Sequence, residues 1–229
     1  MPSLASATSK SPPSVTRSAR TVSIAVLGSR VLGLVREQVL AALFGAGREF
    51  DAFLTAFRIP NLLRDLFAEG ALSAAFVTTF TRKLTLEGDR AAWRLANIVL
   101  NALLVIISLV TAAGILAAPW IVNLIAPGFA EIPGKVELTT LLTRIMFPFL
   151  LLIAVAALAM GMLNAKQQFG IPASASMMFN IGSIVGGVGL AYWFDPQLGP
   201  RAMIGMSIGT LIGGAAQLFI QVPSLFRQG

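Results

Sequence analysis

The sequence predicts an all-α fold, a polytopic bundle of about six transmembrane helices. This prediction rests on the composition and on the spacing of the charged residues. Of the 229 residues, 56% are hydrophobic and only 12% are charged, about half the charged fraction of an ordinary soluble domain. Four long stretches contain no charged residue: 95–130, 145–165, 167–194 and 202–226. Each reaches the ~20 residues with which a helix crosses the ~30 Å hydrocarbon core of a bilayer.

Two further apolar segments precede these stretches and differ from them by containing charged residues. The predicted helices are residues 21–44, 50–80, 92–124, 137–164, 172–194 and 202–223. The bundle thus covers 21–225, and residues 1–20, rich in Ser, Thr and Pro, are predicted to be a disordered tail. A signal peptide is the alternative for the N-terminus. It is less favoured, because the apolar run after Arg20 ends before Arg30 and no small-residue cleavage site is evident.

The basic residues outside the predicted spans indicate the orientation in the membrane. Nine of them lie on the side of residue 1: Lys10, Arg17, Arg20, Arg82, Lys83, Arg90, Arg94, Lys166 and Arg227. Three lie on the other side: Arg48, Lys135 and Arg201. Because short cytoplasmic loops carry the excess of Lys and Arg, both termini are predicted to be cytoplasmic.

Several function classes are disfavoured by what the chain lacks. It contains no Cys and no His, which removes disulfides, thiolate chemistry and Ser-His-Asp arrangements. It has no GxxxxGK[ST] phosphate-binding loop and no dinucleotide fingerprint. Its basic residues are scattered over loops, without the interleaved aromatic residues typical of nucleic-acid binding. We therefore predict no enzyme, no catalytic residue, no metal site, no cofactor and no nucleic-acid partner.

Nine charged residues fall inside the predicted spans, and eight of these lie on the first two helices. They are Arg30, Arg36, Arg58, Arg64, Arg144, Glu37, Asp51, Asp65 and Glu69. Such a residue costs ~2.5–3.5 kcal/mol at the centre of a bilayer on insertion scales. Arg30 follows Arg20 by ten residues, or ~15 Å of helix, which places it near the midplane. A residue at that depth needs an ionic partner or a water-filled cavity.

Two interpretations of these charges remain open. In the first, the acidic residues pair with arginines and lock the first two helices together. In the second, arginines line a water-filled cavity for an anionic substrate, because the planar guanidinium forms paired hydrogen bonds with phosphate and keeps its charge. Helical geometry places Arg30 and Glu37 on one face of the first helix, with Arg36 about 120° away.

The second helix separates its charges in the same way. Four of them share one stripe: Asp51, Arg58, Asp65 and Glu69. Arg64 lies off this stripe, so Arg30, Arg36 and Arg64 need not all pair with acids of their own helices. Pro60 is predicted to act as a hinge, because it lacks an N–H donor and clashes with the preceding turn. A broken, charged helix commonly lines a transport pathway in a membrane.

The last two predicted helices are rich in glycine. Residues 182 and 186, 205 and 209, and 209 and 213 are pairs of glycines at the GxxxG spacing. Small residues at this spacing let two helix backbones approach closely. We therefore predict close packing between helices at these positions rather than a ligand site.

Residues 29–80 form the most specific motif of the chain. They read SRVLGLVREQVLAALFGAGREFDAFLTAFRIPNLLRDLFAEGALSAAFVTTF. This segment resembles the N-terminal signature of the MurJ/MviN family of lipid II flippases, within the multidrug/oligosaccharidyl-lipid/polysaccharide exporter superfamily. Residues 118–130 (APWIVNLIAPGFA), 147–165 (FPFLLLIAVAALAMGMLNA) and 169–173 (FGIPA) resemble the family too. The resemblance covers about residues 20–225.

The resemblance implies a function and a set of binding residues. Family members flip lipid II, the undecaprenyl-diphosphate-linked peptidoglycan precursor, across the bacterial cytoplasmic (inner) membrane, by alternating access of two lobes around a cationic cavity. Arg30, Arg36 and Arg64 match arginines of that cavity, and Ser29 precedes the first of them as in the family pattern. The resemblance therefore implies that these four residues bind the substrate.

Two acidic residues also match the family pattern. Asp51 matches the family's essential aspartate at the start of the second helix, and Glu37 stands where an acid often follows the second arginine. We therefore expect Asp51 and Glu37 to act as gating residues or counter-ions. Our hypothesis is that Asp51 pairs with one of the three arginines in one state and releases it in another.

The length of the chain departs from the family pattern. Family members have two lobes, and the six predicted helices correspond to the N-terminal lobe. The chain is therefore expected to be inactive alone and to need a C-terminal lobe, besides lipid II and the bilayer, as partners. Two alternatives remain: a related exporter of another polyprenyl-linked glycan or a drug, and a non-transporting truncated half.

Overall fold

A computed structural model describes residues 13–67 and 71–228, and within these ranges every regular element is a helix. The predicted all-α bundle is confirmed. The helices are α1 (Pro13–Phe44), α2 (Arg48–Phe67), α3 (Ala71–Glu87), α4 (Asp89–Ile125), the 3-10 helix η1 (Pro127–Glu131), α5 (Lys135–Met146), α6 (Phe149–Ala165), α7 (Gly170–Phe194), α8 (Pro200–Phe219) and α9 (Val222–Phe226).

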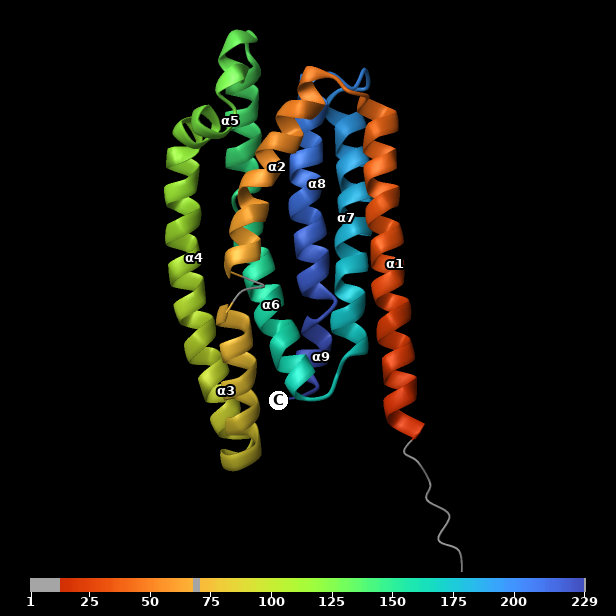
Figure 1. Cartoon of the computed structure of the whole chain (residues 1–229), viewed down its shortest axis with the longest axis vertical. Coiled ribbons are helices and arrows are strands. Elements are labelled where there is room, and N and C mark those ends of the chain that lie inside the picture. The colour runs from red at the N-terminus through yellow and green to blue at the C-terminus, as the bar shows by residue number, and fades with distance from the viewer. Residues whose placement is uncertain (1–12, 68–70, 229) are drawn as a thin grey trace, which may run out of the picture.

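The helices run alternately up and down the long axis of the bundle (Figure 1). Helices α2 and α3 together cross the bundle once, and α5 and α6 together cross it once in the same way (Figure 1). The start of α1 and the C-terminus lie at the same end, and we call the opposite end, with the α1–α2 turn, the distal end (Figure 1). Within the described residues, four segments are long and apolar enough to cross a membrane: Asp89–Ile125, Lys135–Ala165, Gly170–Phe194 and Pro200–Phe226. The predicted number of about six spans is therefore approximate.

The predicted helix 50–80 corresponds to two described helices, and residues 68–70 between them lie outside the described residues. Helix α2 ends at Phe67 and α3 begins at Ala71, whereas Pro60, the predicted hinge, lies buried inside α2. Proline deprives the carbonyl of Ala56 of its helical donor, yet the helix continues past it. Glu69, part of the predicted stripe, lies outside the described residues.

The predicted helix 137–164 is interrupted. Helix α5 ends at Met146, and α6 begins at Phe149. Pro148 explains the interruption, because it donates no hydrogen bond and its ring clashes with the carbonyl four residues earlier. The buried Phe147 ring at this junction occupies a notch in α4: a Cβ added at Gly114 would lie 2.1 Å from the ring.

Helix α1 begins at Pro13, inside the segment predicted as a disordered tail. Residues 1–12, the rest of that predicted tail, lie outside the described residues. The other helices start and end close to the predicted positions, except that α8 ends at Phe219 and the short α9 follows.

Helices α7 and α8 pack so closely that their backbones touch, as the glycine spacing predicted. A Cβ added at Gly209 would lie 2.1 Å from the Cα of Gly187, and one at Gly213 would lie 2.6 Å from the carbonyl oxygen of Phe179. Helix α1 lies against the other side of α7 (Figure 1). The pair α7–α8 therefore carries α1 and fixes its place relative to α2 and α6.

Candidate functional site

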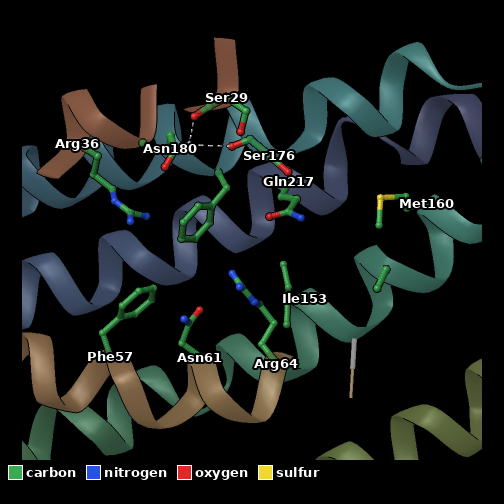
Figure 2. Close-up of a pocket in the computed structure, with 13 residues that line it drawn as sticks. Ser29, Arg36, Phe57, Asn61, Arg64, Ile153, Met160, Ser176, Asn180 and Gln217 are labelled. Carbon is green, nitrogen blue, oxygen red and sulfur yellow. Dashed lines mark hydrogen bonds between the residues drawn. The ribbon is translucent and has the colours of Figure 1, made fainter. Parts of the chain in front are cut away.

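Two adjoining pockets lie where α1, α2, α6 and α7 face one another. The first has a volume of about 370 Å³ and is lined by Arg36 and Arg64, which point into it from α1 and α2 (Figure 2). The second has a volume of about 860 Å³ and is lined by Arg30 and Arg64. Both are also lined by Ser29. The structure thus brings together Ser29 and the three arginines of the predicted site, although they come from two helices.

Arg36 is half-buried and held by aromatic rings. Its guanidinium carbon lies 5.8 Å from the ring centroid of Phe57 on α2 and 5.3 Å from that of Phe179 on α7. Such cation–π contacts stabilise a guanidinium through its face. Its N–H groups, which point outward in the plane of the guanidinium, remain available as donors. Among the described acidic residues, none lies within salt-bridge distance of Arg36.

Arg64 has an acidic partner that the stripe on α2 did not indicate. Its Nη2 and Nε atoms donate to Oδ1 of Asp65, at 2.8 and 3.1 Å. The long arginine side chain reaches the neighbouring carboxylate even though successive residues do not face each other on a helix. The Arg64 side chain is 27% exposed and that of Asp65 is 52% exposed, so this pair lies at the edge of the pocket.

Arg30 and Glu37 are both exposed and do not pair with each other, nor does Arg30 pair with any other described acid. Arg144, on α5, donates from Nε to the backbone carbonyl of Ile115 at 3.2 Å. Arg58 is exposed and lines neither of these two pockets. Within the described residues, the interpretation that acids lock α1 to α2 therefore gains no ion pair from Arg30 or Arg36.

Asp51, in the first turn of α2, pairs with a lysine rather than with an arginine. Its Oδ2 accepts a hydrogen bond from Nζ of Lys135, the first residue of α5. The Lys135 side chain is only 6% exposed, and its Nζ lies 3.8 Å from the ring centroid of Phe129. Sequence reasoning had assigned Lys135 to a loop. One signal was present: a cation at a helix N-terminus opposes the helix dipole and so calls for an acidic partner.

Three amide side chains complete the first pocket, and sequence reasoning missed them. They are Asn61 on α2, Asn180 on α7 and Gln217 on α8 (Figure 2). Nδ2 of Asn180 donates to the backbone carbonyls of Ser29 and Ser176, at 3.2 Å each (Figure 2). The available signal was their occurrence in apolar helices, where an amide needs a hydrogen-bonding partner or a polar cavity.

We expect Asn180→Ala to loosen α1 from α7. The substitution removes the side-chain hydrogen bond to Ser29, worth about 0.6–1.5 kcal/mol. Thermal unfolding of the purified protein in detergent should then shift down by about 2–5 °C. Asn97→Ala, at an exposed position of α4, is the control and should leave the melting temperature unchanged. Equal melting temperatures for the two variants would contradict this role of Asn180.

A row of phenyl rings leads from the distal end to the first pocket. Phe44, Phe50, Phe53 and Phe57 are stacked in succession, with ring centroids 6.2, 6.4 and 6.4 Å apart. Phe57 continues to Phe149 on α6, at 6.1 Å, and Phe149 to Phe179 on α7, at 5.5 Å. Arg36 thus lies at the inner end of this row, between Phe57 and Phe179.

Comparisons with known proteins show what the chain as a whole is similar to. The family model described as lipid II flippase MurJ matches residues 40–229. A probable lipid II flippase MurJ of Rhizobium meliloti is 41% identical over 202 residues, covering 87% of this chain and 37% of the relative. The lipid II flippase MurJ of Burkholderia cenocepacia is 37% identical over 209 residues, covering 91% and 40%.

A solved structure, the inward closed conformation of a lipid II flippase MurJ, is similar with a TM-score of 0.70 and 31% sequence identity. The similarity covers 90% of this chain and 42% of that one. The chain therefore spans about two fifths of the length of the proteins that it matches.

Proposed function

This chain belongs to the MurJ family, and from that premise we propose that it forms the N-terminal lobe of a lipid II flippase in the bacterial cytoplasmic membrane. The observation that carries the proposal is the convergence of Arg30, Arg36 and Arg64 on two adjoining pockets. Three permanent positive charges at one place in an apolar bundle suit an anionic head group and disfavour a cationic drug.

The diphosphate of lipid II fits this arrangement chemically. Its oxygens accept paired hydrogen bonds from guanidinium groups, and these charge-assisted bonds are stronger than hydrogen bonds between neutral groups. The guanidinium group also keeps its charge at physiological pH. Arg36 keeps its donors oriented by stacking on Phe57 and Phe179. Arg64 lines both pockets, so it can follow a ligand that moves from one pocket to the other. Ser29 lies between them and supplies a hydroxyl.

Transport requires a second body. Alternating access arises when two lobes rock about a shared site, and the family members that this chain matches are more than twice as long. We propose that the remaining part of such a protein supplies the other wall of the cavity, and that the six predicted helices do not transport by themselves. Nine basic residues lie on the side of the N-terminus and three on the other side of the predicted spans, which supports a cytoplasmic N-terminus.

A chimera tests this function. Residues 20–228 replace the matching N-terminal part of the Burkholderia relative, and the chimera is expressed in cells depleted of their own lipid II flippase. We expect the chimera to restore growth and lipid II export, and this chain alone to restore neither. Changing Arg30, Arg36 and Arg64 together to Gln should abolish the rescue.

The matched control changes three exposed arginines outside the two pockets, Arg58, Arg94 and Arg201, to Gln. This control should still rescue growth at the same protein level. Rescue by the variant that lacks Arg30, Arg36 and Arg64 would refute the arginine-lined cavity. Failure of the unsubstituted chimera, expressed and folded, would refute the flippase assignment itself.

A further inference from the structure

The ion pair between Asp51 and Lys135 is markedly asymmetric in exposure. The Asp51 side chain is 53% exposed, whereas the Lys135 side chain is 6% exposed. The ring of Phe129 covers the ammonium group, and Lys135 is the first residue of α5. The carboxylate is therefore well exposed to water, whereas little of the lysine side chain is.

Among the described residues, no second carboxylate lies within salt-bridge distance of the buried ammonium, although Glu49 also interacts with Lys135 electrostatically. Glu49, the next acid on α2, is engaged by Nε of Arg48 at 2.7 Å. The exposed N–H groups of the first turn of α5 add partial positive charge around Lys135. Asp51 is thus the group that neutralises Lys135 in this structure.

The consequence of losing each partner follows from burial. Removing one member of a pair is strongly destabilising when the other remains as an uncompensated buried charge, and nearly neutral when the other is exposed to water. Loss of Asp51 leaves a buried cation, and loss of Lys135 leaves a hydrated carboxylate. The stability of the protein should therefore fall much more on loss of Asp51 than on loss of Lys135.

We propose that Asp51 is a positioning residue whose task is to neutralise Lys135, and that Asp51 becomes dispensable once Lys135 is apolar. The pair lies between the first turn of α2 and the first turn of α5 at the distal end, so an uncompensated charge there would disturb the packing of α2 against α5. Helix α2 carries Arg64, so this disturbance would reach one wall of the arginine-lined pockets. Its consequence for transport rests on the proposed flippase function, whereas the pairing itself does not.

This assignment differs from a gate in which Asp51 exchanges between arginine partners. A gate needs the carboxylate itself, so no change at Lys135 can replace it. A neutralising partner needs only that the buried charge disappear. The two roles therefore give opposite results when Asp51 and Lys135 are substituted together.

The experiment measures growth rescue by the chimera for Asp51→Asn, Lys135→Met, the double variant Asp51→Asn/Lys135→Met, and Asp51→Asn/Lys135→Arg. We expect Asp51→Asn to lower rescue by about tenfold or more, because it leaves a buried charge unpaired. Lys135→Met should rescue like the unsubstituted chimera, and the double variant with Met should recover most of the loss. The double variant with Arg should stay defective, since it keeps the positive charge. A double variant with Met as defective as Asp51→Asn would overturn the proposal.

Thermal unfolding of the purified chain in detergent gives a second readout that needs no transport. Asp51→Asn should lower the melting temperature by about 5 °C or more, and the added Lys135→Met should restore it. If the unsubstituted chimera fails to rescue while the melting temperatures follow this pattern, the flippase assignment fails and the pairing stands. If Asp51→Asn melts like the unsubstituted chain, the pairing proposal fails regardless of transport.

Discussion

Gly209→Leu should prevent the bundle from folding. A Cβ at Gly209 would lie 2.1 Å from the Cα of Gly187, so any side chain must push the backbones of α7 and α8 apart. Overpacking a core costs about 1–3 kcal/mol even where side chains can yield, and here the obstacle is backbone. Because α7 also carries α1, the separation would displace Arg30 and Arg36 from the pockets. We expect the variant to aggregate or to be degraded, as measured by gel filtration in detergent and by protein level.

Gly189→Leu is a matched control for this substitution. Gly189 lies on α7, in the same tightly packed pair, but a Cβ there would have no atom within 4 Å. This variant should elute and melt like the unsubstituted protein. Gly209→Ala should be intermediate, because its single methyl group requires a smaller separation. A Gly209→Leu variant that folds like Gly189→Leu would show that the close contact does not determine stability.

Arg36→Gln should reduce flipping by the chimera by about 10–100-fold. In the proposed site the substitution removes a charged partner for the diphosphate, and a hydrogen bond to a charged group is worth about 1.5–3 kcal/mol. Glutamine keeps much of the length of the side chain and its ability to donate, so loss of packing contributes little. The measurement is lipid II export at matched protein levels. Arg94→Gln, at an exposed position of α4, is the control and should export normally.

Arg36→Lys distinguishes charge from geometry at the same position. Lysine keeps the positive charge but lacks the planar fork that forms paired hydrogen bonds and stacks on Phe57 and Phe179. We therefore expect lipid II export between those of the unsubstituted chimera and Arg36→Gln. Equal export by Arg36→Gln and Arg94→Gln would show that Arg36 does not bind the substrate.

The sequence predicted features that depend on composition and local spacing. Uncharged stretches located the helices from α4 onward, and the GxxxG spacing identified the contact between α7 and α8. The cost of burying charge in a membrane identified nine residues, and helical geometry together with the family resemblance narrowed them to Arg30, Arg36 and Arg64, which line the two adjoining pockets. In these cases one physical requirement, the desolvation of charge or the room needed for two backbones to touch, allows few arrangements of the residues concerned.

Features that depend on contacts between distant segments were not predictable. Lys135 precedes the predicted helix by two residues, and only the packing of α5 against α2 buries it beside Asp51. The Asp65 partner of Arg64 depends on how a long side chain folds back, which a helical stripe does not describe. The proline at position 148 indicated a break, but the apolar run continues on both sides of it and so favoured a single predicted helix.

The row of phenyl rings from Phe44 to Phe179 has a consequence for the passage of ions within the bundle. The rings stack between a distal pocket lined by Asp51 and Lys135 and the pocket lined by Arg36, and Phe53 in the middle is only 4% exposed. An ion entering from the distal end would have to shed its hydration shell to pass them, at a cost of many kcal/mol. In the described part of the chain, this apolar row therefore separates the two polar pockets, so that ions do not pass readily from one pocket to the other along it.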